Sequence, residues 1–336
     1  FVVEWEGEGS YLLSRRNSLF YVNSLSDTPV HLLDFPAPFF KVVLCRYRIF
    51  QRLFRFMFYN VLKLNDGTIF MTFGNDIAYY KNSEIKKVNT KGRKFRWLRS
   101  GCAFDNENSV FFGEYLKNEK REPVNIYKFD MINGNINIVY TFENGAVRHI
   151  HGIFYDKFSD RLWVVTGDDL NECKIISTKD RFKTIEVLGE GDESWRCVSL
   201  IFTKNYIYYG TDSEFQQNFL YRVCKKTRNR KKLSEVNGPV YYSKLKGNNI
   251  FFATTAELRR RDKGSIYKGI TPTIYCLQKN DDVTEVFLTQ KDSFSPIFFM
   301  PGTIHFSRGN SNDSELYFYC VGVEKYDNKA LSLLIK

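Results

Sequence analysis

The chain has 336 residues, of which 43% are hydrophobic and 26% are charged, an ordinary composition for a globular protein. No run of apolar residues approaches the length of a membrane-spanning helix, so a membrane span is not expected. The formal charge of +11 favours anionic partners, such as nucleic acid, acidic lipid surfaces or acidic polysaccharide. A lysine-rich surface without any such partner would explain the charge equally well.

Aromatic residues are abundant, with 31 Phe and 21 Tyr but only 4 Met and 8 Pro. Aromatic side chains suit half-buried pleated surfaces, which favours an all-β fold. The seven cysteines are widely spaced and form no C-x-x-C pair, so we expect buried thiols rather than a zinc site or a complete disulfide framework. No signal-like apolar segment is present, but a leader could have been removed. A bacterial periplasmic or secreted location and a cytoplasmic one therefore both stay open.

Short apolar runs separated by turns fill the first 90 residues. Residues 1–36 supply four of them, EWEGEG, SYLLS, SLFYVN and PVHLLDF. A second group lies between about residues 55 and 89 and consists of RFMFYNVLKL, GTIFMTFGND, IAYYKN and EIKKVN. Each group predicts a small sheet of four strands.

Three segments in the middle of the chain repeat one pattern: LRSGCAF (98–104), VRHIHGIF (147–154) and WRCVSLIF (195–202). Each has an arginine after a large apolar residue, and Arg99, Arg148 and Arg196 are 49 and 48 residues apart. A second apolar run follows each segment and ends in glycine with an acidic residue just after it: SVFFGEY (109–115), RLWVVTGDD (161–169) and YIYYGTDS (206–213). Third and fourth runs complete each group.

The pattern continues towards the C-terminus, where two further groups are found. One contains GPVYYSKLKGNNIFFATTAE (238–257), TIYCLQ and TEVFLTQ, and the last contains PIFFMPGTIHFS, LYFYCVGVE and ALSLLIK. The basic run KKTRNRKK (225–232) predicts a solvated hairpin tip, and RRRDKG (259–264) an exposed insertion. Basic residues are scattered rather than gathered in one stripe, so a nucleic-acid partner is not expected.

Evenly spaced strands with a period of about 48 residues predict a β-propeller. We expect a single all-β domain over residues 1–336 with seven four-stranded blades, although six or eight blades remain open because the first and last groups are weakly marked. A pair of β-sandwiches is the structural alternative, but it gives no reason for the period.

In a propeller the first strand of each blade lines the central channel, so the three repeated arginines should converge there. Arginine suits bidentate recognition of carboxylate, sulfate or phosphate. We therefore assign these residues to substrate binding: Arg99, Arg148, Arg196, Asp212, Glu257 and Trp195. The structural alternative pairs the arginines with the acidic residues that follow the second strands: Glu114, Asp168, Asp169, Asp212 and Glu257.

His149 and His151 are two of only four histidines in the chain. They share one face of the predicted strand and Arg148 points to the other, unless a bulge or the strand end relaxes the alternation. Imidazoles suit acid–base catalysis or metal ligation. A divalent cation would need further ligands, for which Asp168, Asp169 and Glu172 are the candidates. No other cofactor is expected.

The segment TKDRFKTI (178–185) resembles a degenerate Asp-box, the Ser/Thr-x-Asp-x-Gly-x-Thr-aromatic turn motif of the sialidase-type (BNR) propellers. Thr178, Asp180 and Thr184 match the motif, while Phe182 replaces its glycine and Ile185 its last aromatic residue. Stretches between about residues 55 and 320 also resemble bacterial glycosyl-hydrolase-like propeller proteins.

The resemblance to sialidases implies a sugar carboxylate held by Arg99, Arg148 and Arg196. It also implies a tyrosine nucleophile backed by a glutamate, for which Tyr115 and Glu114 are the counterparts. This chain has no FRIP-like motif near its N-terminus, and its Asp-boxes are nearly absent. A divergent relative that acts on acidic glycan is therefore better supported than a true sialidase.

Polysaccharide lyases of similar architecture cleave uronate chains by β-elimination, which needs a cation for the sugar carboxylate, a base and an acid. Arg148 or Arg196 would supply the cation, His149 or His151 the base and Tyr115 the acid. Asp168 completes the predicted catalytic residues.

The sequence leaves a glycoside hydrolase and a polysaccharide lyase both open, acting on an acidic oligo- or polysaccharide. The competing hypothesis is a non-catalytic glycan- or protein-binding propeller. In either case Trp97, Trp163 and Trp195 would be available to stack on sugar rings.

Overall fold

The computed structural model describes residues 1–64, 66–90, 94–105, 107–213, 215–257, 271–295 and 298–335. The basic segment expected to be an exposed insertion at residues 259–264 lies outside these residues.

Across the described residues the strands form seven sheets, of which five have four strands, one has five and one has three. In this described part of the chain, the other regular elements are two short α-helices and two single 3₁₀ turns. The predicted all-β, seven-bladed β-propeller is confirmed. The chain divides into two compact units, and the prediction of a single domain stays a prediction.

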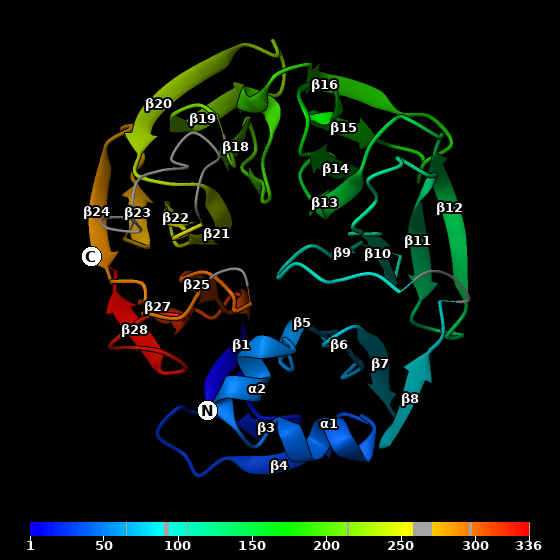
Figure 1. Ribbon diagram of the computed structural model, residues 1–336, viewed down its shortest axis with the longest axis vertical. Helices are drawn as coiled ribbons and strands as arrows, with labels where there is room; N and C mark the ends of the chain where they lie inside the picture. Colours follow the sequence, from blue (N-terminus) through cyan, green and yellow to red (C-terminus); the bar gives the residue numbers. More distant parts are fainter. Residues whose placement is uncertain are drawn as a thin grey trace. The chain divides into compact units, whose positions relative to one another are not determined.

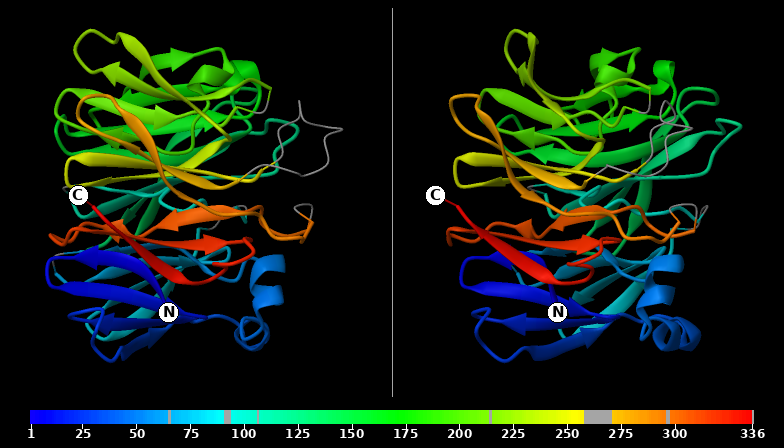
Figure 2. Two further views of the ribbon diagram at one scale, coloured as in Figure 1. Left: turned by 90° about the vertical axis from the view of Figure 1, so that its left-hand side faces the viewer. Right: turned by 60° about the vertical axis from the view of Figure 1, so that its left-hand side comes forward.

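The first unit comprises Phe1–Arg93 and Thr289–Lys336 and contains three sheets. The first sheet consists of β1 (Val2–Gly7), β2 (Ser10–Arg15), β3 (Ser18–Val22), β4 (Val30–Asp34) and β26 (Arg308–Gly309). The second consists of β5 (Phe58–Lys63), β6 (Ile69–Phe73), β7 (Asp76–Lys81) and β8 (Glu84–Val88). The third consists of β25 (Thr303–Phe306), β27 (Glu315–Val321) and β28 (Ala330–Leu334). The helices α1 (Phe39–Leu44) and α2 (Arg48–Leu53) lie at one end of this unit's strands (Figure 2).

The second unit, Lys94–Leu288, contains four sheets of four strands. The first consists of β9 (Ala103–Phe104), β10 (Ser109–Gly113), β11 (Val124–Asp130) and β12 (Ile136–Phe142). The second consists of β13 (His149–Asp156), β14 (Arg161–Gly167), β15 (Lys174–Thr178) and β16 (Glu186–Glu190). The third consists of β17 (Ile201–Phe202), β18 (Tyr206–Gly210), β19 (Asn218–Cys224) and β20 (Arg230–Val236). The fourth consists of β21 (Val240–Lys246), β22 (Asn249–Thr254), β23 (Thr273–Leu277) and β24 (Val283–Leu288). In Figure 1, β13 and β21 lie on the inner side of this unit, and β12, β16, β20 and β24 on its outer side. The 3₁₀ turns are η1 (Leu170–Glu172) and η2 (Glu193–Trp195).

Burial follows the position of a strand within its sheet. The second strands are almost entirely buried, as in β6 and β14, whereas the fourth strands β8 and β16 are largely exposed. The core of the second unit therefore lies between neighbouring sheets, where the side chains of Ile150 and Ile153 on β13 pack with Phe111 on β10.

The glycine at the end of the second strand explains part of the repeat. A Cβ atom on Gly113 would lie 2.5 Å from the side chain of Ile150, and one on Gly210 would lie 2.5 Å from that of Val240. In both cases the missing side chain allows the first strand of the next sheet to approach closely. At Gly113 and Gly210 the glycine is thus a packing requirement between neighbouring sheets.

A β-bulge recurs in the first strand of several sheets. The ladder with the second strand shifts between Val3 and Trp5 in β1, between Phe58 and Asn60 in β5, between Ile150 and Gly152 in β13, and between Val240 and Tyr242 in β21. In each case one extra residue is left out of the pairing, which lets its side chain leave the regular alternation.

Several other predictions can be checked locally. The basic run at 225–232 spans the turn between β19 and β20, so the predicted hairpin tip is confirmed. All seven cysteines lie in described parts of the chain as free thiols, and six of them are buried, as expected. None of the helices that the structure describes is long and apolar enough to cross a membrane.

Candidate functional site

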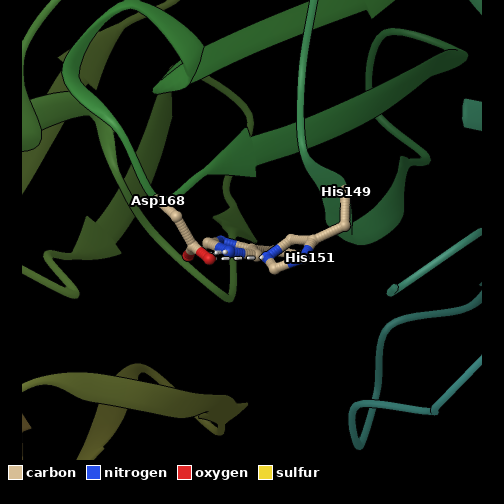
Figure 3. Close-up of side chains that lie close together, drawn as sticks. All are labelled: His149, His151 and Asp168. Atoms are coloured by element: carbon tan, nitrogen blue, oxygen red, sulfur yellow. Dashed lines mark hydrogen bonds and ion pairs between the residues drawn. The ribbon is translucent and has the colours of Figure 1, made fainter. Parts of the chain in front are cut away.

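The candidate site is centred on Asp168, the residue directly after β14 in the second unit. Its backbone φ of +120° is a value that residues other than glycine rarely adopt, and such strain is often found at functional sites. Its side chain is only 13% exposed. Figure 3 shows the imidazoles of His149 and His151 directed towards its carboxylate.

Each imidazole is fixed by its other nitrogen. His149 Nδ1 lies 2.8 Å from the Leu116 carbonyl oxygen, and His151 Nδ1 lies 2.9 Å from the Cys197 carbonyl oxygen. His149 Nε2 is 3.3 Å from Asp168 Oδ2, and His151 Nε2 is 3.4 Å from Asp168 Oδ1. Both rings are therefore held with Nε2 towards the same carboxyl group.

The strand pairing explains how both histidines reach Asp168. His149 is paired with Gly167 in the ladder of β13 and β14, so it lies beside the residue that precedes Asp168. His151 is the extra residue of the β13 bulge, so its side chain escapes the strict alternation of the strand. A Cβ atom on Gly167 would lie 2.9 Å from His151 Cε1, so only glycine leaves room for the ring.

Two of the three repeated arginines bind Asp168. Arg148 Nη1 lies 2.9 Å from Oδ2, and Arg196 Nη2 lies 3.0 Å from Oδ1. Arg196 also contacts Asp212, with 3.3 Å between Nε and Oδ2. Arg99 is almost completely buried and is not among the ion-pair partners of Asp168 in the described chain, so its part in the site stays a prediction.

Electrostatics keep the carboxyl group ionised. Burial opposes the ionisation of Asp168, but its contacts with His149 and His151 outweigh burial and hold its pKa far below the usual range. Burial lowers the pKa of His151, and its contact with Asp168 offsets this only in part. At neutral pH the cluster therefore contains a carboxylate and a neutral His151 ring.

Tyr115 belongs to the same cluster. Its ring centroid lies 4.1 Å from that of His149. Burial, the charge of Asp168 and the charge of Glu257 raise the pKa of Tyr115 well above its usual value. Glu114 is fully buried and accepts hydrogen bonds from the Tyr127 hydroxyl (2.8 Å) and the Asn125 backbone N–H (2.9 Å). These contacts anchor β11, and the catalytic pairing of Glu114 with Tyr115 stays a prediction.

Arg121, an arginine that the repeat did not indicate, binds Asp169 and Glu172. Arg121 contacts Glu172 Oε1 through Nε at 2.6 Å and pairs with Asp169 through Nη2. Glu172 Oε2 also accepts a hydrogen bond from the Arg148 backbone N–H at 2.8 Å. Asp169 and Glu172, expected as cation ligands, are thus engaged by Arg121. This residue lies in the loop between β10 and β11, where no periodic signal marks it.

The tryptophans are not arranged as a sugar-binding platform. Trp97 and Trp163 are buried, with rings packed on Phe112 and Phe202. Trp195 is partly exposed, but the Arg230 guanidinium lies 3.9 Å from its ring centroid and Gly189 packs against it. Trp195 was assigned to substrate binding, and its contacts instead indicate a packing role.

A hollow of about 690 Å³ lies beside Asp168. Acidic side chains predominate among its charged lining residues: Asp168, Asp169, Glu172 and Glu193, with Lys174. Lys174 is already paired with Glu190 at 2.7 Å. Asp168, Asp169 and Glu172 are likewise paired with Arg148, Arg196 and Arg121, so ion pairs compensate most of the charge along this hollow.

The segment that resembles an Asp-box forms a closed turn between β15 and β16, the position expected for that motif. Asp180 accepts hydrogen bonds from the Thr178 hydroxyl at 2.9 Å and from the Thr184 backbone N–H and hydroxyl at 2.9 and 2.7 Å. Phe182, which stands where the motif has glycine, has a φ of +76°.

No protein-family model matches the chain, and no curated protein matches it. Among solved structures it is similar to oligogalacturonate lyase from Vibrio parahaemolyticus, with 10% identity, a TM-score of 0.62, and coverage of 99% of this chain and 88% of that one. It is also similar to an oligogalacturonate lyase in complex with manganese, with 8% identity, a TM-score of 0.54, and coverage of 94% and 86%.

A third similar structure is the extracellular domain of a putative hybrid two-component system from B. thetaiotaomicron, with 14% identity and a TM-score of 0.59. That match covers 97% of this chain, which spans only 37% of the length of its counterpart. At these identities the similarities show the β-propeller fold alone. Membership of the sialidase-type family stays a prediction.

Proposed function

We propose that the chain binds an acidic, uronate-type saccharide at the Asp168 cluster and cleaves it by β-elimination. The observation that carries this proposal is the convergence of two guanidinium groups and two imidazoles on the Asp168 carboxylate, with the Tyr115 ring packed beside the His149 imidazole. The similarity to two oligogalacturonate lyases is consistent with this class of substrate.

The two arginines have different roles in this proposal. Arg196 is held by Asp168 and Asp212, and its side chain is only 6% exposed, so we assign it to positioning Asp168. Arg148 is 21% exposed and its Nε atom has no hydrogen-bond partner among the described residues. Arg148 is therefore the guanidinium that would neutralise the sugar carboxylate.

Proton transfer is assigned to groups other than the histidines, because both imidazoles face Asp168. The raised pKa of Tyr115 keeps its phenol protonated, which suits the acid that protonates the leaving oxygen. Asp168, Glu257 and Asp212 are the carboxylates whose charges raise that pKa, and of these Glu257 is exposed. Glu257 is therefore our candidate for the base.

The test is to incubate the protein with homogalacturonan, short galacturonate oligomers and other uronate polymers, and to follow the absorbance of the unsaturated product. Replacing Tyr115→Phe or Glu257→Gln should lower the rate by about 10²–10⁴-fold. Tyr47→Phe makes the same chemical change at an exposed tyrosine outside the site and should leave the rate unchanged. No absorbance rise with any uronate polymer would exclude the lyase.

One observation favours a non-catalytic binding propeller as the second candidate: Arg148 and Arg196 already form ion pairs with Asp168, which compensates part of their charge. Such a site needs no proton donor. Calorimetric titration with the same oligomers distinguishes the two functions, because binding without unsaturated product, unchanged by Tyr115→Phe, is the outcome that the binder predicts.

A further inference from the structure

We propose that His149, His151 and Asp168 form a binding site for a divalent transition-metal ion, with two imidazole nitrogens and one carboxylate as protein ligands. Their ligand atoms all lie within 4.8 Å of one another. The binding site itself is independent of the saccharide, and only its role in catalysis rests on the function proposed above.

The hydrogen bonds of the two rings fix where their protons are. A backbone carbonyl oxygen accepts hydrogen bonds and cannot donate them, so the Nδ1 atoms that face Leu116 O and Cys197 O must carry hydrogen. An imidazole that binds a metal ion does so through the nitrogen that carries no hydrogen, so with hydrogen on Nδ1 the Nε2 atom of each ring is the one that can bind an ion. Both Nε2 atoms are directed at Asp168.

The two rings and the carboxylate meet in a largely buried place. His149 and His151 are each only 3% exposed, and their Nε2 atoms lie 3.3 and 3.4 Å from carboxylate oxygens. Among the described residues His149 Nε2 has no hydrogen-bond partner, whereas His151 Nε2 is within hydrogen-bonding distance of Asp168 Oδ1. A buried imidazole nitrogen without a partner is unfavourable, and a cation between it and the carboxylate would stabilise both groups.

A metal ion fits this geometry. Two ligand atoms that are each about 2.1 Å from an ion, at a near-tetrahedral angle, lie about 3.4 Å apart. Each of the two nitrogen–oxygen distances is close to this separation, one to Oδ2 and the other to Oδ1 of Asp168. The ion would lie off the line that joins each nitrogen to its oxygen and would give His149 Nε2 a partner.

The surroundings provide the support that metal ligands usually have. The carbonyl oxygens of Leu116 and Cys197 orient the rings, and Arg148 and Arg196 hold the carboxylate. Two imidazoles and one carboxylate suit Mn²⁺, Fe²⁺, Co²⁺ or Zn²⁺ better than Ca²⁺ or Mg²⁺, which prefer oxygen ligands alone.

Three protein ligands leave coordination positions open for an exogenous ligand. Within the function proposed above, the saccharide carboxylate would take such a position, close to Arg148, and the ion would share its charge neutralisation. With the ion bound, the site would therefore take an oxyanion, such as a sugar carboxylate, rather than a neutral sugar.

The experiment uses the full chain after chelator treatment and dialysis, titrated with Co²⁺ and followed by its visible absorption bands, and in parallel with Mn²⁺ and Zn²⁺ by calorimetry. We expect one ion per chain. His149→Gln, His151→Gln and Asp168→Asn should each weaken binding by at least about tenfold to 100-fold, the range seen when groups that support a metal site are lost.

Two matched variants serve as controls. His31→Gln removes an exposed histidine of the other unit, and Asp169→Asn removes the carboxylate next to Asp168 that is bound by Arg121. Both should retain the Co²⁺ spectrum. Because a ligand variant could fail to fold, the wild type and both controls are also heated with and without Co²⁺, and all three should melt at a higher temperature with the ion.

The outcomes separate the proposals. A wild type that binds none of the ions with 1:1 stoichiometry, or whose binding survives all three ligand replacements, overturns the metal site. Metal binding without unsaturated product from any uronate supports the metal site and overturns the lyase. Elimination at an equal rate in the chelator-treated protein overturns the catalytic role of the ion but not its binding.

Discussion

Replacing Gly167 by alanine should damage the Asp168 cluster directly. The added Cβ would lie 2.9 Å from His151 Cε1 and 3.1 Å from Arg196 Cγ, the first of which is closer than such contacts occur in proteins. The φ of Gly167 is not positive, so alanine fits the backbone and the effect is purely steric.

Neither neighbour of Gly167 can move away easily. The His151 ring is fixed at Nδ1 by Cys197 and at Nε2 by Asp168, and Arg196 binds both Asp168 and Asp212. Overpacking of this kind costs about 1–3 kcal/mol. For a chain of 336 residues that corresponds to a fall in Tm of about 1–2 °C for each kcal/mol.

The assay combines thermal unfolding with the Co²⁺ titration. Gly167→Ala should lower both Tm and cobalt affinity. Gly210→Ala is the matched control, because its Cβ would strike Val240 at 2.5 Å and should lower Tm without changing the cobalt spectrum. If Gly167→Ala unfolds at the wild-type temperature and binds cobalt equally well, the rigid packing inferred around His151 is wrong.

Three further predictions concern residues around the cluster. Arg196→Met leaves buried carboxylates without their cation and should lower the unfolding free energy by about 3–5 kcal/mol in denaturant titrations, with Arg196→Met/Asp212→Asn recovering part of the loss. Hydrogen bonds from Thr184 lower the pKa of Asp180 to about 2, so the ionised carboxylate stabilises the fold above its unfolded pKa, and this stabilisation is lost as the pH falls towards 2. In Asp180→Asn, Tm should therefore depend less on pH over this acidic range. An unchanged dependence of Tm on pH would contradict the assignment. Trp195→Phe weakens the contact with Arg230 and should lower stability by about 1 kcal/mol while saccharide affinity stays the same; reduced affinity would restore Trp195 as a binding residue.

The period of the sequence predicted most of the fold because each group repeats the same packing problem. Alternating and continuous apolar runs gave the strands, and the recurring glycine marked the places where neighbouring sheets approach, as at Gly113 and Gly210. The same repeat predicted that Arg148 and Arg196 lie close together, because equivalent positions of neighbouring sheets are adjacent, and both arginines bind Asp168.

The details of the site depended on features without a periodic signal. The bulge that turns His151 towards Asp168 follows from the pairing of two strands and has no signature in β13 alone. Arg121 lies in a loop outside the repeat, so its capture of Asp169 and Glu172 was not foreseen. Composition likewise could not tell a tryptophan available to sugar from Trp195, whose ring is covered by another side chain.

The recurring bulge separates chemistry from architecture in this chain. Its extra residue is Glu4 in β1, Tyr59 in β5, His151 in β13 and Tyr241 in β21, four different side chains at one equivalent point. Because that residue is left out of the pairing between the two strands, the register on either side does not require a particular side chain there. Each of these side chains still fits its own surroundings, since Glu4 and Tyr59 are buried and Glu4 accepts a hydrogen bond from the Ser14 hydroxyl. The bulge therefore lets one residue per sheet take a local role of its own while the strands that carry it stay alike.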